Sequence, residues 1–364
     1  MKKIVMEVLK IFYDNGYEAY AVGGFVRDMI LNKESFDVDI TTNATPNEVS
    51  QIFKDVKLSF EQYGSVHLKY KQINFEITTY RMEFEYKNKR KPLSIIYTDK
   101  LIIDLKRRDF TMNTLCMDKE GKILDLLSVT DDINCKVIKT VGNADEKLRE
   151  DSLRILRAIR FATELDFELD IELESAIINN RESLKTLSFY RKKQELNRIF
   201  SSKNVLKGIK LLKSFGLDEY LEIELPNHVV KTSDPIGIWA QVNPSSNYQF
   251  TRNEKACLNA ILRVLKDEKI DNINLYKEGN YVCYIASQIL GLKESNIYDR
   301  YDALPIKNRS DIKINGNDIK LLLGLKDSAK IKLIINDMEK RIINNKLKND
   351  KKELIKYIIN KYML

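Results

Sequence analysis

Two carboxylates stand at alternate positions in a short apolar run. Asp37 and Asp39 belong to the segment FDVDI. Successive side chains of a strand point to opposite faces, so both acids would share one face while Phe36, Val38 and Ile40 face a core. Mg²⁺ prefers oxygen ligands and also binds substrate phosphates, so it commonly neutralises such pairs. Two bound ions could stabilise the attacking and leaving oxygens of a displacement. A solvated strand edge would show the same bare pattern.

A glycine pair precedes these acids. Gly23 and Gly24 follow the apolar residues 20–22 and come before FVRDMIL, which has a helical pattern. Glycines let backbone N–H groups approach a phosphate, and a helix N-terminus adds a favourable dipole. A plain strand-to-helix turn would use the same residues. Found together with the acidic pair, the glycines predict that one element holds a triphosphate and the next holds its metal ions.

The elements that must position these residues change character along the chain. Up to about residue 140, short alternating runs such as 66–80 predict strands, and the segment from Thr45 predicts a capped helix. After residue 141, the apolar spacing is almost purely helical. Residues 234–247, with two prolines, are expected to form loops. The pattern predicts an α+β head followed by helical domains.

Composition narrows the class of protein. With 364 residues, the chain is long enough for several domains, and its net charge of +8 suits a polyanionic partner without proving one. The four cysteines form no CxxC pair, which argues against a disulfide framework or a zinc cluster and favours a reducing compartment. No apolar run reaches the length of a membrane span, and the first residues do not resemble a signal peptide. We therefore expect a cytoplasmic protein with no membrane association.

Several motifs together resemble one family. The run GGFVRD at 23–28 with its acidic pair, RRDFTMN at 107–113 and EDSLR at 150–154 are similar to motifs of the class II tRNA nucleotidyltransferases. This family comprises the bacterial CCA-adding enzymes and the related poly(A) polymerases, and belongs to the DNA polymerase beta superfamily. Residues 304–324 resemble the tail of CCA-adding enzymes from low-GC Gram-positive bacteria. The resemblance covers nearly the whole chain.

The resemblance implies both a fold and an activity. The fold would be α+β, with a polymerase-beta-like nucleotidyltransferase head containing a small mixed sheet at 1–140. All-helical domains would follow: a neck with a nucleotide-reading helix at 141–205, a body at 206–305 and a tRNA-binding tail at 306–364. The activity would be template-independent addition of C, C and A to the 3′ end of tRNA from CTP and ATP, with Mg²⁺ as cofactor and diphosphate as product.

The alternatives within the enzyme class share all these motifs. They are a poly(A) polymerase and an enzyme that adds only the terminal A beside a separate CC-adding partner. The tail resemblance favours full CCA addition. A non-catalytic RNA-binding module is disfavoured because Asp37 and Asp39 are intact. The oligomeric state is left open.

The resemblance also assigns site residues. Asp37 and Asp39 would be catalytic and hold the metal ions, and Glu76 matches a third catalytic acid. Asp151 and Arg154 would read the Watson–Crick edge of the incoming base, because a carboxylate accepts from an amino group and a guanidinium donates to ring or carbonyl acceptors. The residues implied to contact the nucleotide are Gly23, Gly24, Arg27, Arg108, Asp109, Asp151, Arg154, Arg157 and Arg160.

One segment and a few single positions need separate interpretation. Residues 80–92 are charged and poor in apolar periodicity, and are interpreted as a surface loop similar to the flexible loop of CCA- and A-adding enzymes. Val129 stands where the family has glycine after Asp125, which puts the local turn in doubt. Tyr190 replaces a usual glutamate. The two histidines, His67 and His228, are expected to be structural.

Overall fold

The computed structural model describes residues 1–35, 37–60, 64–87, 91–292, 296–325 and 327–363. The chain forms two compact units, Met1–Ile223 and Glu224–Leu364, which are described separately. Within the described ranges, no helix combines the length and apolar character needed to cross a membrane.

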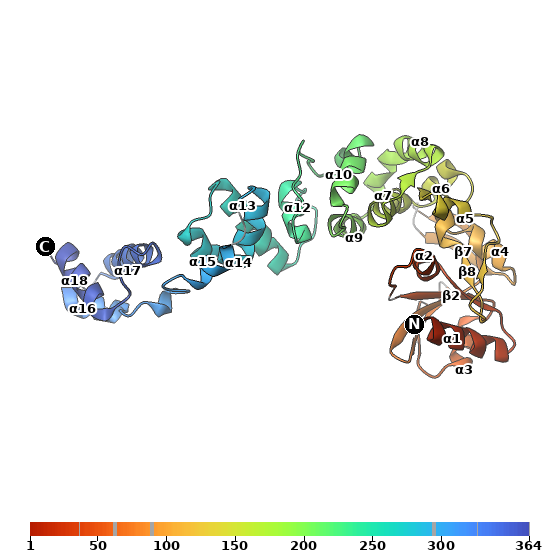
Figure 1. Ribbon diagram of the computed structural model, residues 1–364, viewed down its shortest axis with the longest axis horizontal. Helices are drawn as coiled ribbons and strands as arrows, with labels where there is room; N and C mark the ends of the chain where they lie inside the picture. Colours follow the sequence, from red (N-terminus) through yellow and green to blue (C-terminus); the bar gives the residue numbers. More distant parts are fainter. Residues whose placement is uncertain (36, 61–63, 88–90, 293–295, 326, 364) are drawn as a thin grey trace. The chain divides into compact units, whose positions relative to one another are not determined.

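A seven-stranded mixed sheet lies in the N-terminal part of the first unit (Figure 1). Its strand order is β3-β4-β5-β2-β1-β8-β9. Only β2 and β5 pair in parallel, and the other neighbours are antiparallel. The predicted small mixed sheet is therefore confirmed. Its strands are β1 (Ala19–Val22), β2 (Val38–Thr42), β3 (Val56–Phe60), β4 (Ser65–Tyr70), β5 (Ile73–Thr79), β8 (Cys116–Met117) and β9 (Ile123–Leu124).

Short helices lie between these strands. The amphipathic α1 buries Val5, Val8, Leu9 and Phe12, which recur at the spacing of one helical face. The predicted capped helix is α3, where Thr45 and Glu48 form a reciprocal capping box that satisfies the first backbone N–H groups. The helices are α1 (Lys2–Asp14), α2 (Gly24–Ile30), α3 (Pro46–Ile52), α4 (Leu101–Lys106), η2 (Thr111–Asn113) and α5 (Thr130–Asn134).

The rest of the first unit is mainly helical. It contains α6 (Ala144–Glu150), α7 (Leu153–Leu165), α8 (Ile171–Asn180), η3 (Arg181–Thr186), α9 (Phe189–Phe200), α10 (Val205–Ser214) and α11 (Asp218–Leu221). The segment predicted as an all-helical neck also holds one short strand, β11 (Glu168–Leu169), which pairs in parallel with β10 (Val137–Ile138). Head and neck thus share one compact unit, and the finer division into four domains stays a prediction.

The interpretation of residues 80–92 as a loop is wrong for most of its length. Two strands, β6 (Arg81–Lys87) and β7 (Lys91–Tyr97), pair as an antiparallel hairpin. Residues 88–90 between them lie outside the described residues. The strand signal is the alternation of polar residues with Met82, Phe84 and Tyr86, which the charge content obscures. The Tyr80 N–H donates to the Thr42 carbonyl at 2.7 Å, so the hairpin begins directly beside strand β2.

The second unit is helical in its described parts. The expectation that residues 234–247 form only loops is wrong, because they contain α12. Asp234 accepts a hydrogen bond from the Ile236 N–H at 2.8 Å, Pro235 begins the helix, and Trp239 is buried. A proline at the first helical position starts a helix and does not break one. The helices are α12 (Pro235–Gln241), α13 (Arg252–Lys266), α14 (Asn272–Ile289), α15 (Ile297–Asp302), η4 (Arg309–Asp311), α16 (Gly316–Leu323), α17 (Ser328–Ile343) and α18 (Lys351–Tyr362).

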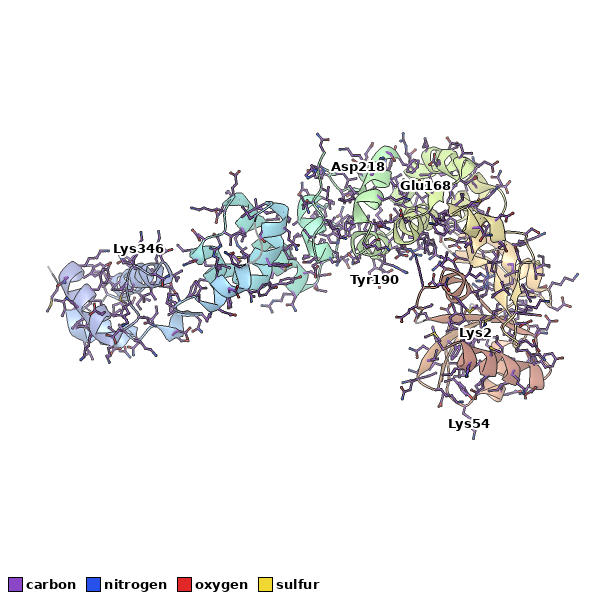
Figure 2. The ribbon with its side chains drawn as sticks, in the orientation of Figure 1. Lys2, Lys54, Glu168, Tyr190, Asp218 and Lys346 are labelled. Carbon is purple, nitrogen blue, oxygen red and sulfur yellow. The ribbon has the colours of Figure 1, made fainter. Side chains whose placement is uncertain are left out.

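Two departures from the family pattern are accommodated locally. The Asp125 carboxylate accepts hydrogen bonds from the N–H groups of Val129 and Thr130, both at 2.8 Å, and so holds the turn before α5. Val129 has a φ of −110°, whereas the left-handed position is Ser128, so glycine is not required at Val129. Tyr190 lies exposed on α9 (Figure 2), where its hydroxyl accepts from Gln194 at 2.9 Å.

Candidate active site

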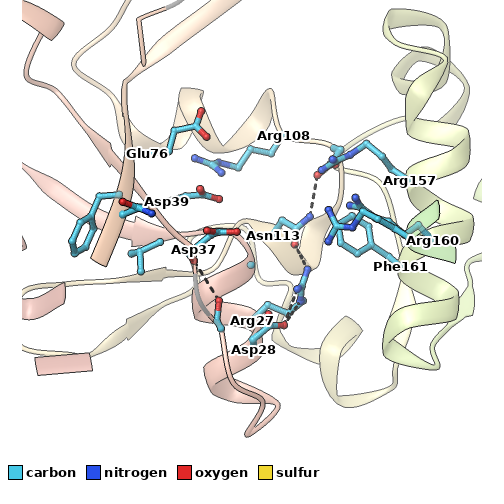
Figure 3. Close-up of a pocket in the computed structure, with 18 of the residues that line it drawn as sticks. Arg27, Asp28, Asp37, Asp39, Glu76, Arg108, Asn113, Arg157, Arg160 and Phe161 are labelled. Carbon is cyan, nitrogen blue, oxygen red and sulfur yellow. Dashed lines mark hydrogen bonds and ion pairs between the residues drawn. The ribbon is translucent and has the colours of Figure 1, made fainter. Parts of the chain in front are cut away.

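The acidic residues meet through the register of the sheet. On β2, Asp39 lies opposite Glu76 of the parallel strand β5. Asp37 comes immediately before β2, and all three carboxylates line one cavity (Figure 3). Val38 and Ile40 are buried, as the alternation predicts, while Phe36 lies outside the described residues. The pairing of Glu76 with Asp39 arises only in the tertiary structure, because 37 positions separate the two residues in the sequence.

The crowding of these carboxylates has an electrostatic consequence. Burial raises the pKa of Asp39 to about 6, Arg108 opposes this, and the negative charges of Glu76 and Asp37 add to the rise. A cation placed there would stabilise the ionised forms. Among the described residues, no group of three or more His, Cys, Asp or Glu side chains forms a ready metal-binding cluster. Asp37, Asp39 and Glu76 supply oxygen ligands, which suit a divalent cation.

The turn between β1 and α2 requires glycine. Gly23 has a φ of 76°, in the region that L side chains rarely adopt. A Cβ atom at this position would lie 2.8 Å from Oδ2 of Asp39. The first glycine of the pair therefore lets the chain turn tightly beside the Asp39 carboxylate. The turn leads directly into α2, as predicted.

A basic wall faces the same cavity. Arg27 of α2, Arg108 after α4, and Arg157 and Arg160 of α7 all line it. Three of these guanidinium groups surround one ring: the Phe161 centroid lies 5.2 Å from Arg27, 5.4 Å from Arg157 and 4.2 Å from Arg160. Burial, together with the neighbouring charge of Arg157, lowers the pKa of Arg160 to about 10. Such a convergence of like charges suits a polyanion.

Hydrogen bonds link the arginines into a network. Asn113 accepts from Arg27 Nη1 at 3.0 Å and donates through Nδ2 to Asp109 at 3.1 Å. Asp109 in turn accepts from Arg157 Nε at 2.7 Å (Figure 3). Sequence reasoning did not select Asn113 or Phe161 as site residues. The available signal was their position in the sequence. Asn113 ends the RRDFTMN motif, and Phe161 directly follows Arg160 on α7.

The cavity between the acidic and basic walls measures about 630 Å³, within the range of small-ligand sites. His67, expected to be structural, also lines it, and its register partner on β5 is Glu76. The predicted site residues that the structure brings together here are Gly23, Gly24, Arg27, Asp37, Asp39, Glu76, Arg108, Asp109, Arg157 and Arg160.

Two predicted base readers are not among the described residues that line this cavity. Asp151 has an extended backbone and separates α6 from α7. Its carboxylate accepts from the Leu153 N–H at 3.0 Å and pairs with Arg191 at 3.2 Å. Arg154 is buried, donates to the Lys147 carbonyl at 2.7 Å and forms an ion pair with Glu150. The Arg154 N–H donates to the Asp151 carbonyl at 3.0 Å. The base-reading role of both side chains stays a prediction.

Comparisons with known proteins agree with this geometry. Residues 19–139 match the family described as the poly A polymerase head domain, and residues 246–358 match a tRNA nucleotidyltransferase domain 2 family. Residues 166–226 match a family described as an RNA- and SrmB-binding site of polymerase A. The fold and site therefore define a nucleotidyltransferase of the polymerase-beta-like class.

Relatives over the full length narrow this class. The CCA-adding enzyme of Oceanobacillus iheyensis is 32% identical, covering 97% of this chain and 96% of its own length. That of Staphylococcus haemolyticus is 31% identical, covering 96% of each. The crystal structure of the Bacillus stearothermophilus CCA-adding enzyme in complex with CTP superposes with a TM-score of 0.86 at 26% identity, covering 98% of this chain and 96% of that one. The chain belongs to the class II CCA-adding enzymes.

Proposed function

We propose that this chain adds C, C and A to the 3′ end of tRNA, using CTP and ATP and releasing diphosphate. The observation that carries the proposal is the cavity itself. Carboxylates of β2 and β5 form one wall and the arginines of α2 and α7 form the other. An acidic wall next to a basic one suits a metal-bound triphosphate, and the full-length likeness to CCA-adding enzymes supports the choice of substrate.

Asp37 and Asp39 would hold the divalent metal ions that this family uses, which we propose to be Mg²⁺. The raised pKa of Asp39, with like charges beside it, fits that role. When bound, such ions stabilise negative charge on the attacking and leaving oxygens. Glu76 adds a third carboxylate next to Asp39 in the sheet.

The basic wall would bind and orient the triphosphate. Guanidinium groups suit phosphates because they donate two parallel hydrogen bonds. Asn113 and Asp109 hold Arg27 and Arg157 in place through the hydrogen bonds described above. We propose that Asp151 and Arg154 read the base once a nucleotide is bound. This reading requires Arg154 to leave its present contacts with Lys147 and Glu150.

The decisive experiment supplies the purified chain with tRNA transcripts that lack CCA, CA or only A. Each nucleotide is provided alone and in pairs, and products are sized on a sequencing gel. We expect two C residues and then one A on the shortest transcript. Long A tracts would identify a poly(A) polymerase. Extension only of the transcript that already ends in CC would identify an A-adding enzyme. Absence of any extension, with intact fold, would contradict the proposal.

A further inference from the structure

A buried carboxylate outside the cavity contacts one of its arginines. Asp104 of α4 has no exposed surface. Its Oδ2 lies 3.2 Å from Nη2 of Arg108, which lines the cavity, and accepts from the Thr41 hydroxyl at 2.9 Å. Its Oδ1 accepts from Arg107 Nε at 2.8 Å. Asp104 therefore joins the cavity to both the RRDFT segment and the catalytic strand β2.

Arg108 lies between two sets of carboxylates. Figure 3 shows its side chain pointing toward Glu76 and Asp39. Among the described residues, however, the ion pair of Arg108 is with Asp104, and none joins it to Asp39 or Glu76. Burial lowers the pKa of Arg108, but Asp104 raises it more strongly than Asp39 does, and the net direction is upward. The Nε atom of Arg108 is buried and has no hydrogen-bond partner, so donor capacity is left over.

We propose that Asp104 is a positioning residue that keeps Arg108 from forming an ion pair with Asp39 and leaves it available for a nucleotide phosphate. The proposal rests on the function proposed above. A guanidinium so close to free carboxylates would otherwise form a charge-assisted pair with one of them. That pair would occupy the guanidinium that is proposed to bind phosphate. It would also neutralise a carboxylate that is proposed to bind metal.

Strand β2, which carries Asp39, also contacts Asp104, the carboxylate that pairs with Arg108 in place of Asp39. Thr41 lies two residues after Asp39 on β2, so both side chains project from the same face of the strand. Its hydroxyl is buried and donates to the same Asp104 oxygen that faces Arg108. This hydrogen bond therefore links Asp104, the partner of Arg108, to the strand that carries Asp39.

The test measures equilibrium binding of CTP without divalent metal, by titration calorimetry. The variant D104N/R107Q removes one negative and one positive charge and leaves Arg108 without its anchor. The matched control R107Q keeps the pair of Asp104 with Arg108. We expect D104N/R107Q to bind CTP about tenfold more weakly than R107Q, the loss of roughly one charge-assisted hydrogen bond. Affinity for tRNA should be equal in the two variants.

A mutant cycle separates positioning from charge balance and from folding. R108Q should weaken CTP binding in the R107Q background but have little further effect in D104N/R107Q, because Asp104 acts through Arg108. Equal CTP affinity of D104N/R107Q and R107Q, or full additivity of R108Q, would overturn the proposal. Should D104N/R107Q fail to unfold cooperatively, T41V provides the test. It removes only the hydrogen bond to Asp104, and unchanged CTP affinity would count against the idea. Whether the wild type extends tRNA is a separate result that bears only on the proposed function.

Discussion

Asp109 accepts a hydrogen bond from Arg157 Nε at 2.7 Å, and so joins the RRDFT segment to the arginine-rich helix α7. Burial raises the pKa of Asp109, but Arg157, Asn113 and the Phe110 N–H outweigh it and hold that pKa well below its usual range. The pair is therefore ionised at neutral pH. It connects the sheet-containing part of the first unit to the helix that supplies half of the basic wall.

Breaking this pair should destabilise the first unit and weaken nucleotide binding. We expect Asp109→Asn to lower the free energy of unfolding by about 3 kcal/mol, because Arg157 then loses its buried partner. Chemical unfolding followed by fluorescence measures this value. The matched control is D109N/R157Q, which removes both charges and should be less destabilised than D109N alone. Equal destabilisation of the two variants would show that an unpaired Arg157 carries no penalty of its own.

Removal of either Asp37 or Asp39 should abolish incorporation of both nucleotides. We expect Asp37→Ala and Asp39→Ala to lose CTP and ATP incorporation while tRNA binding stays nearly intact, because the carboxylates act on the metal and not on the RNA. Primer-extension rates and filter binding measure the two properties. Glu34→Ala, which removes another acid from the cavity lining, is the control and should retain activity. Near-normal turnover of Asp37→Ala or Asp39→Ala would exclude the metal role.

Asp151 should govern which base is accepted. We expect Asp151→Ala to reduce the preference for CTP over UTP or GTP by about 1–3 kcal/mol, the usual value of a well-formed base contact. Competition between nucleotides on one tRNA transcript measures this. Arg191→Ala is the control, since it removes the ion pair with Asp151 but leaves the carboxylate. An equal loss of rate for all four nucleotides would mean that Asp151 only holds the junction of α6 and α7.

The β6–β7 hairpin should matter for the final A. Glu83 and Ile95 face each other across the two strands, so a two-residue Asn-Gly turn between them shortens the hairpin without changing its register. We expect this variant to add two C residues normally, because the hairpin does not include Asp37, Asp39 or Glu76. We expect it to add A much more slowly, because the hairpin begins beside β2. Single-turnover CTP and ATP incorporation on matched tRNA ends measures the difference. Equal losses for both nucleotides would assign the hairpin to folding or general turnover.

The end of the second unit should be sensitive to acid. Asp337 accepts hydrogen bonds from Lys361 and Tyr362, both at 2.8 Å, and from Tyr357. Burial raises its pKa, but these three donors outweigh it and hold the pKa well below the usual range. The stabilisation is then complete above the unfolded carboxyl pKa of about 3.9 and is lost as the pH falls through the folded value.

Asp337→Asn tests this dependence. We expect the variant to be less stable than the wild type by about 1–2 kcal/mol at pH 7, because one oxygen acceptor and the charge are lost. The difference should shrink as the pH is lowered from about 4 toward about 2. Urea unfolding at several pH values measures it, with Asp327→Asn, a simple helix cap of α17, as the control. A difference that does not change with pH would mean that ionisation of Asp337 does not contribute.

Local patterns determined much of the molecule. Alternation along 37–40 predicted the shared face of the acids, the glycine pair predicted the turn into α2, and Thr45 predicted the cap of α3. These features depend on residues close in sequence, where side-chain period and backbone preference act directly. The same reasoning missed the β6–β7 hairpin and α12, because charge in one case and proline in the other obscured the periodic signal.

Only the tertiary structure decided how distant residues combine into a site. The parallel pairing of β2 with β5 brings Glu76 beside Asp39. Packing of α7 brings Arg157 to Asp109, and packing of α4 against the sheet brings Asp104 to Thr41 of β2. None of these contacts leaves a local period in the sequence. These contacts depend on strand register and on the need of buried charges for partners. Both are established only when the whole first unit has folded.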